Sequence, residues 1–425
     1  MFHIFVYLES FKINKIMKYY TLISLLLFFQ VIFSQQCSDD DSFLIIKDVV
    51  YEISDESYEG RKTGELGGEK AASYIKKYLI NLFRENKNVD VYSQEFEFFT
   101  SKNPHVQNKD IKKNAENILC FIDNNQLETI IIGAHYDHLG YGDFSSLYSG
   151  DKSLIHNGAD DNASGVALAI SLMKTLYDSS RMYNYLFIAF DGEEMGLYGS
   201  SFFCKNPTVD LDNVRFMLNF DMVGRLNESK DLAINGVGTS SQWSSLLNTT
   251  NDKYQFKLIL SESGVGPSDH SSFYYKNVPA IHFFTGQHSD YHKPSDDSDK
   301  INYIGIQDIL CFVSDVIQSS STIENFDFQE TQNDSNETPK FSVTLGVMPD
   351  YMFAGKGMRV DGVSKNKTAF KAGVLQGDII VKMGEFNVFD MMTYMEALSL
   401  FQKGDTTNVQ ILRSGNLMDL MVIFQ

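Results

Sequence analysis

Short apolar runs and longer amphipathic stretches alternate along the first three quarters of the chain. The apolar runs are nearly continuous, as in strands that are buried on both faces of a sheet, and between them apolar residues return with the helical period. The predicted strands are Asn117–Ile122, Thr129–His135, Tyr185–Phe190, Phe216–Phe220 and Ala280–Phe284. The predicted helices are Gly67–Phe83, Ser164–Tyr177, Ser240–Asn248 and Ile304–Gln318.

This alternation predicts an α/β fold over residues 42–323, in which a mixed, mostly parallel sheet is sandwiched by helices. Residues 324–340 are polar and acidic without an apolar period, which is typical of a linker. Residues 341–425 contain short strand-like runs and two helical stretches, so we expect a second, small β-rich domain there. A length of 425 residues fits two folded units better than one.

The N-terminal residues have the layout of a secretory signal peptide. Met17 and Lys18 precede a long apolar run that ends in small and polar residues. A membrane span is the competing interpretation, but the run is short for a span and no basic flank follows it. We therefore expect a signal peptide within residues 1–34 with its start at Met17, no stable membrane insertion, and export to the periplasm or the extracellular space.

Composition narrows the classes of function. The formal net charge of −19 repels phosphate backbones, so nucleic-acid binding is not expected. The four cysteines lack the paired spacing of a metal site. Cys120 and Cys311 lie in apolar runs and are expected in the core, and one disulfide of undetermined pairing is compatible with an oxidising compartment.

Histidine and carboxylate residues follow the predicted strands. His135 ends one strand, and Asp137 stands two residues on, where a carboxylate can orient a metal-bound imidazole. Glu193 and Glu194 follow the next strand, close enough for one to bind a metal while the other accepts a proton. Each motif alone has an ordinary explanation as a solvated polar loop.

The recurrence of such residues carries the argument. Asp221 follows a third strand, His292 lies beyond a fourth, and Asp161 stands just before a predicted helix, where a carboxylate could merely complement the helix dipole. Ligand sites in open α/β sheets form at the carboxyl ends of strands. A pair of metal ions about 3.5–4 Å apart needs such a mixture of ligands, with one carboxylate bridging, and nitrogen with oxygen ligands suits zinc. The pattern therefore predicts a two-metal site.

Six motifs occur together in one order: GAHYDH, GADDNASG, FDGEEMGLYGS, NFDMVGR, GPSDHSSFY and DYHKPSD. Together they resemble the co-catalytic zinc peptidase family, which includes secreted bacterial leucyl aminopeptidases, glutamate carboxypeptidase and the transferrin receptor. The resemblance covers about Gly60 to Gln318 and implies the zinc exopeptidase fold with two Zn²⁺ ions.

The resemblance also implies a role for each motif residue. Glu193 would be the general base, Asp137 would orient His135, and the peptide bond after Asp161 would be cis. The implied zinc ligands are His135 and Asp221 for one ion, Glu194 and His292 for the other, and Asp161 as the bridge.

The activity implied is hydrolysis of N-terminal residues from peptide substrates by a zinc-activated water. A carboxypeptidase or dipeptidase would use the same metals and stays open. A glutaminyl cyclase shares the fold but has one zinc, and non-catalytic relatives normally lack ligands; the complete set of five argues against both.

The remaining polar residues of the motifs are interpreted as structural. His282 lies within an apolar strand and is expected to be a satisfied core residue. His138, His156, His270 and His288 lie near the motifs; no ligand role is expected for them, and contact with substrate is the alternative. Asp269, Asp296 and Asp297 are expected to serve caps or loop hydrogen bonds.

The C-terminal domain resembles the bacterial, circularly permuted kind of PDZ domain. The resemblance implies that an extended peptide is added to a sheet edge, with backbone amides of Leu345–Val347 binding its C-terminal carboxylate. A domain that only braces the catalytic unit is the alternative. The matching residues are Leu345–Val347, Gly357–Val360, Ala372–Val374, Gly377–Ile380 and Gly404–Asp405.

Overall fold

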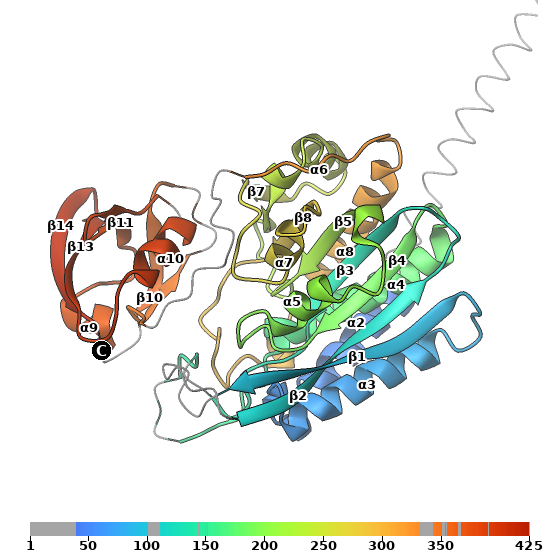
Figure 1. Cartoon of the computed structure of the whole chain (residues 1–425), viewed down its shortest axis with the longest axis horizontal. Coiled ribbons are helices and arrows are strands. Elements are labelled where there is room, and N and C mark those ends of the chain that lie inside the picture. Colours follow the sequence, from blue (N-terminus) through green and yellow to red (C-terminus); the bar gives the residue numbers. More distant parts are fainter. Residues whose placement is uncertain are drawn as a thin grey trace, which may run out of the picture.

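The computed structural model describes residues 40–100, 111–331 and 343–424, apart from 143–144, 149, 151, 351–352, 354, 364–366 and 390. Within these ranges the chain forms two units of secondary structure (Figure 1). The predicted signal peptide at 1–34 lies outside the described residues. Among the helices of the described part, none combines the length and the apolar character needed to cross a membrane.

An eight-stranded mixed sheet forms the centre of the first unit. Its strands are β1 (Val89–Thr100), β2 (Ile111–Ile122), β3 (Thr129–His135), β4 (Asn184–Phe190), β5 (Val214–Phe220), β6 (Asp231–Asn235), β7 (Lys257–Ser261) and β8 (Ala280–Phe284). Their order in the sheet is β1-β2-β4-β3-β5-β8-β6-β7. The central strands β4, β3, β5 and β8 are parallel, whereas β1 with β2, β2 with β4, and β6 with β8 are antiparallel. The predicted mixed sheet is present, with β1, β6 and β7 as strands that were not predicted.

Helices cover both faces of this sheet. They are α2 (Asp40–Ile53), α3 (Leu66–Leu82), α4 (Gly165–Ser179), α5 (Tyr198–Lys205), α6 (Trp243–Asn251), α7 (His270–Tyr274) and α8 (Tyr303–Ser320). On one face α2, α3, α4, α6 and α8 contribute to a single large core, and on the other face α5 packs against α7 (Figure 1). The four predicted helices correspond to α3, α4, α6 and α8.

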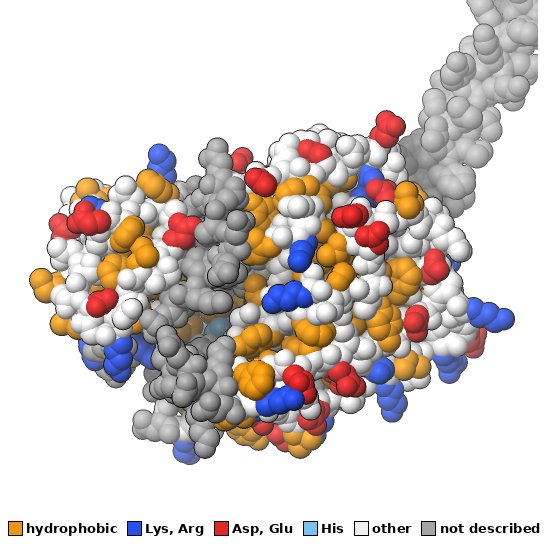
Figure 2. Space-filling model, viewed as in Figure 1, with side chains coloured by type: hydrophobic (Ala, Val, Ile, Leu, Met, Phe, Trp, Pro, Cys, Tyr) orange, Lys and Arg blue, Asp and Glu red, His pale blue; other side chains and the backbone are white. Residues whose placement is uncertain are grey.

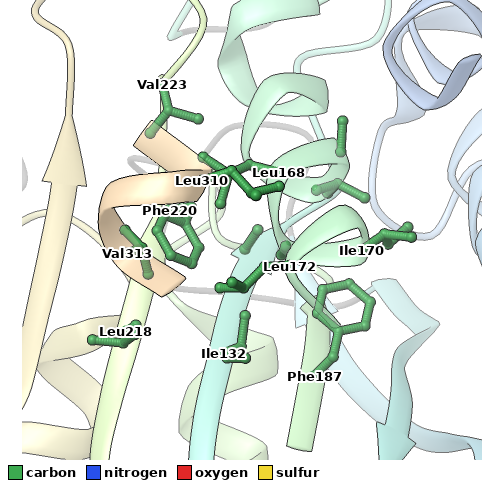
Figure 3. Close-up of a cluster of buried hydrophobic side chains, with 14 of the residues drawn as sticks. Ile132, Leu168, Ile170, Leu172, Phe187, Leu218, Phe220, Val223, Leu310 and Val313 are labelled. Atoms are coloured by element: carbon green, nitrogen blue, oxygen red, sulfur yellow. The ribbon is translucent and has the colours of Figure 1, made fainter. Parts of the chain in front are cut away.

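The central strands are buried on both sides. Ile132 of β3 lies in the large core, whereas its neighbour Ile131 lies in the smaller core under α5 and α7, and both are fully buried. This arrangement explains why the sequence of β3 is an uninterrupted apolar run. Figure 3 shows part of the large core, where Ile132 and Phe220 of the sheet lie near Leu168 of α4 and Leu310 of α8.

The predicted linker, 324–340, begins with a segment that packs on the first unit. The ring of Phe326 lies 4.6 Å from that of Trp243 and 4.9 Å from that of Phe216. Phe328 lies 5.6 Å from Tyr274 in the same way. Phe326 and Phe328, the two aromatic anchors of this segment, were not predicted because the residues around them are polar. Residues 332–340 lie outside the described part of the chain.

The second unit is a small antiparallel sheet with two helices, as the sequence predicts. Its elements are β9 (Val347–Pro349), β10 (Met358–Val363), α9 (Thr368–Ala372), β11 (Ile379–Met383), β12 (Phe386–Asn387), α10 (Met391–Ser399), β13 (Thr406–Arg413) and β14 (Asn416–Ile423). The strand order is β14-β13-β11-β10-β9, and β12 pairs with β11. Leu345, Val360, Ile380 and Ile411 are fully buried in its own apolar core. Among the described residues, β9 therefore lies at an edge of this sheet.

The described cysteines differ in their bonding. Cys120 and Cys204 are free and buried, whereas Cys311 of α8 is disulfide-bonded. Cys37 lies outside the described residues.

Acidic and basic side chains are interspersed over the face shown in Figure 2, rather than gathered by sign.

Candidate metal centre

Four predicted site residues come from neighbouring parallel strands. His135 is the last residue of β3, Asp221 directly follows β5, and Glu193 and Glu194 lie three and four residues beyond β4. Because β4, β3 and β5 run parallel and side by side, their carboxyl ends meet at one edge of the sheet. Asp161 reaches the same place from η2 (Ala159–Ser164), the turn that leads into α4.

The first donor group consists of His135, Asp161 and Asp221. His135 Nε2 lies 3.5 Å from Asp161 Oδ1 and 3.4 Å from Asp221 Oδ1. His135 and Asp161 are buried, and Ser268 Oγ donates a hydrogen bond of 2.8 Å to the other oxygen of Asp221. These side chains could hold one metal ion.

The second donor group lies on the other side of Asp161. His292 Nε2 is 3.2 Å from Asp161 Oδ2 and 3.4 Å from Glu194 Oε1. The opposite ring nitrogen of His292 is 2.9 Å from the backbone oxygen of Ser145, which fixes the orientation of the ring. Asp161 therefore presents one oxygen to each group, as a bridging carboxylate must.

His138 also belongs to this second group. Its Nδ1 lies 2.9 Å from Glu194 Oε1 and 3.8 Å from Asp161 Oδ2, so that His138, Asp161 and Glu194 could hold a metal ion. The prediction that His138 has no ligand role did not foresee this placement. The only signal in the sequence was its position three residues after His135, in a loop without a regular period.

Hydrogen bonds fix the backbone that carries Asp161. The backbone N–H groups of Asp160 and Asp161 donate to Asp296 Oδ2 at 2.9 and 3.1 Å. The peptide bond between Asp161 and Asn162 is cis, as the resemblance implies. Asn162 Nδ2 donates to the backbone oxygen of Phe220 at 2.8 Å, which ties this turn to the end of β5.

Asp137 binds mainly to the loop that carries Glu193 and Glu194. Its carboxylate accepts hydrogen bonds from the backbone N–H of Glu193 (3.0 Å) and Glu194 (3.3 Å) and from Thr63 Oγ1 (3.0 Å). Its carboxylate is 3.6 Å from His135 Nδ1, whereas its backbone oxygen is 3.2 Å away. Asp137 therefore links His135 to the two glutamates, and Thr63 is a supporting residue that the sequence did not reveal.

The two glutamates have opposite electrostatic surroundings. Burial, with the nearby carboxylates of Asp221 and Glu194, raises the pKa of Glu193 well above its usual value, against the opposing influence of His135. Burial works against ionisation of Glu194 too, but His292 and His138 hold the pKa of Glu194 well below its usual value. Within the described residues, the Glu193 carboxylate accepts no hydrogen bond, and the residue is partly exposed to solvent.

The donor set suits zinc. Zinc binds nitrogen and oxygen at about 2.0–2.2 Å, so the ligand atoms of a tetrahedral site lie about 3.3–3.6 Å apart. The pairs of ligand atoms described for His135 and His292 are 3.2–3.5 Å apart. Three carboxylates and two histidines gathered away from water also need positive charge between them. The residues present therefore fit two zinc ions.

Most other histidines and aspartates of the motifs have the structural roles that were expected, in the core or in loop hydrogen bonds. His282 is buried, its Nδ1 accepts a hydrogen bond from Asn219 Nδ2 at 3.1 Å, and burial lowers its pKa to about 4. His288 Nε2 lies 3.1 Å from Asp160 Oδ2. Asp297 accepts a hydrogen bond from Asn157 at 2.7 Å, so it serves a loop, as Asp296 does.

Arg61, from η1 (Glu56–Arg61), is a further residue that the sequence did not reveal. It is fully buried and donates hydrogen bonds to the backbone oxygens of Tyr136 (2.7 Å), Asn157 (2.5 Å) and Gly158 (2.8 Å). It also donates to Ile53 at the end of α2. One guanidinium therefore joins the loop after β3 to the loop that leads to Asp161.

The model of peptidase family M28 matches residues 117–317, which include every ligand of both groups, and the PDZ domain model matches residues 327–423. The chain therefore contains a peptidase family M28 domain. A PDZ domain follows it.

Known proteins are similar over part of the chain. Leucine aminopeptidase 2 of Trichophyton rubrum is 28% identical over 166 residues, which are 37% of this chain and 30% of that protein. The chain thus spans about a third of the length of the first curated relatives that it matches.

Solved structures show the same fold. The zinc aminopeptidase BSAP of Bacillus subtilis superposes with a TM-score of 0.54 at 17% identity, over 68% of this chain and 98% of that one. The glutaminyl cyclase of Bacteroides thetaiotaomicron superposes with a TM-score of 0.53 at 18% identity, over 65% and 96%. The fold alone therefore does not separate a peptidase from a cyclase.

Proposed function

We propose that this chain is an exported aminopeptidase that uses two zinc ions to hydrolyse N-terminal residues from peptides. The observation that carries the proposal is the pair of donor groups that share Asp161, with the Glu193 carboxylate beside them. The match to peptidase family M28 and the similarity to a leucine aminopeptidase and a zinc aminopeptidase support this class.

Each ion would have its own ligands. His135 and Asp221 would hold the first ion, Glu194 and His292 the second, and Asp161 would bridge them. Bound there, the ions would lower the pKa of a bound water and stabilise negative charge on the carbonyl oxygen of the peptide.

The protein's own groups would move the proton. Glu193 has a basic carboxylate without a hydrogen-bond donor among the described residues, so it would take a proton from the water and pass it to the departing amine. Asp137 would keep Glu193 and Glu194 in place through their backbone N–H groups.

Export rests on the N-terminal sequence. The charged and apolar layout after Met17 matches a signal peptide. The disulfide at Cys311 suits an oxidising compartment.

A panel of blocked peptides tests the class of activity. The zinc-loaded protein should release leucine or alanine from free peptides and from C-terminally amidated peptides, but not from N-acetylated ones. The opposite preference would make it a carboxypeptidase. Cyclisation of an N-terminal glutaminyl peptide without hydrolysis would make it a cyclase.

Metal removal is the companion test. Elemental analysis should give two zinc equivalents per chain, and a chelator should abolish hydrolysis, which zinc or cobalt should restore. One tightly bound ion per chain would contradict the two-metal proposal.

The PDZ domain supports a second binding function. The edge strand β9 begins at Val347, the last residue of the predicted carboxylate-binding loop Leu345–Val347, and an extended peptide could pair with this edge. Calorimetry with peptides that have a free or an amidated C-terminus would test it, because only the free carboxylate should bind.

A further inference from the structure

We propose that His138 is a fourth protein ligand of the second metal ion, through its Nδ1 atom. This inference rests on the proposed function, because it concerns one of the two ions in that site. It makes the two ions unequal, since the second would be held by four protein side chains and the first by three.

The distances carry the proposal. His138 Nδ1 lies 2.9 Å from Glu194 Oε1 and 3.8 Å from Asp161 Oδ2, the same two oxygens that face His292 Nε2 at 3.4 and 3.2 Å. The two His138 distances lie below and above the separation of about 3.3–3.6 Å that tetrahedral zinc gives its ligands. The imidazole nitrogens of His138 and His292 therefore face the same two carboxylate oxygens.

Packing leaves the ring of His138 little freedom. The side chain is fully buried, and its backbone N–H donates to the backbone oxygen of Arg61 at 3.3 Å. A Cβ at Gly158 would come within 2.6 Å of two atoms of the imidazole ring, so only glycine leaves room for the ring there. Nε2 has no hydrogen-bond partner among the described residues, so Nδ1 makes the polar contacts of the ring.

The rival role for His138 is orientation. An Nδ1–H group could donate a hydrogen bond to Glu194 and hold that carboxylate without touching the metal. The two roles make opposite demands on the atom at the Nδ1 position: a metal ligand must offer a lone pair, whereas an orienting group must offer a hydrogen.

A ligand role would also place the reaction at the first ion. Four protein ligands complete a tetrahedron, whereas three leave a position for water, which is the difference between closed and open zinc sites.

Two variants of nearly the same shape separate the roles. His138→Asp places a carboxylate oxygen near the Nδ1 position, and His138→Asn places an amide there that can donate to Glu194 but binds zinc poorly. Zinc affinity of metal-free protein is measured by competition with a chromophoric chelator. If His138 is a ligand, the Asn variant should bind the second zinc at least about tenfold more weakly, whereas the Asp variant should retain most of the affinity.

The reverse order, with the Asn variant retaining the second zinc and the Asp variant losing it, would overturn the proposal and make His138 an orienting residue. Unchanged affinity in both variants would overturn it as well. Either result leaves two ions in the unaltered protein, so the proposed function would stand. If the wild-type protein binds no zinc, both the ligand role of His138 and the proposed function are wrong.

A measurement on the wild-type protein avoids any question of folding. X-ray absorption at the zinc edge counts imidazole ligands in the protein loaded with two equivalents. Three histidines shared by two ions are expected if His138 binds, and two histidines would overturn the proposal.

Discussion

Glu193 and Glu194 are adjacent in sequence, yet their carboxylates have different surroundings. Glu194 contacts His138 and His292, and its pKa is held well below the usual value. Glu193 has no such partner within the described residues, and its pKa is raised, first by burial and then by neighbouring carboxylates. At the scale of single residues, this difference separates a group suited to bind a cation from one suited to accept a proton.

Paired substitutions test that separation. Glu193→Gln keeps the size of the side chain but removes the basic carboxylate, so turnover should fall by roughly 10²–10⁴-fold with both zinc ions still bound. Glu194→Gln removes a proposed ligand, so bound zinc should fall together with activity. Turnover and zinc content are measured on both variants. Full activity in the Glu193 variant would contradict the mechanism, and zinc loss from that variant alone would exchange the two roles.

The sequence predicted these residues because strand ends are visible in it. His135 and Asp221 each close a continuous apolar run, and a polar residue at that boundary is easy to see. His138, Thr63 and Arg61 could not be found in this way, because their places depend on how loops cross in space. The pairing of Arg61 with Asn157 joins residues 96 positions apart.

Among the elements, burial on both faces decided what could be predicted. β3, β4, β5 and β8 were all predicted, β3 and β8 with their observed bounds, because every position in these strands is buried. β7 has no buried residue, and its apolar run is only Leu258–Leu260. The first half of β2 is mostly in contact with solvent and has no continuous apolar run. β1 pairs with β2 along its whole length, and this pairing rather than its own pattern defines it.

The connections between elements depend on Arg61. Lysine keeps the charge, but a single ammonium group cannot reach all four backbone oxygens that the guanidinium binds. Two or more buried oxygens would lose their donors at about 1–3 kcal/mol each, so Arg61→Lys should lower the free energy of unfolding by about 2–5 kcal/mol. Because the affected loops carry His135, His138 and Asp161, zinc affinity should fall too.

Denaturant unfolding and zinc titration measure both effects. Arg84→Lys is the matched control, because Arg84 is an exposed residue paired only with its neighbour Glu85 among the described residues. That variant should match the unaltered protein. An Arg61 variant with unchanged stability and zinc affinity would show that the four hydrogen bonds do not position the metal loops.

At the scale of the whole molecule, the metal centre and the PDZ domain occupy separate units. Every proposed ligand precedes residue 293, and the PDZ unit has its own buried core. Composition alone would place the boundary at the start of the polar stretch, near residue 324. The contacts of Phe326 and Phe328 instead extend the first unit to Thr331, whose backbone N–H donates to Tyr274 Oη at 3.0 Å.

Two truncations therefore should differ. A chain that ends after Thr331 should keep the stability and the turnover of small substrates, because it retains all ligands and the aromatic anchors. A chain that ends after Glu324 loses both anchors and should be less stable by about 2–4 kcal/mol, somewhat less than the removal of fully buried aromatic residues. Trp243 is the only tryptophan and packs against Phe326, so its fluorescence reports unfolding of this unit directly.

Point variants in the full chain separate the anchors from the deletion itself. Phe326→Ala should reproduce much of the loss of stability, because it removes the ring between Trp243 and Phe216 and the contact with Arg215, whose guanidinium lies 5.5 Å from that ring. Phe99→Ala, at a position of β1 that is 52% exposed, is the control and should change stability little. Zinc content should stay at the wild-type level in both variants, because neither touches a ligand. Equal stability of the two truncated chains would show that the first unit ends before Phe326.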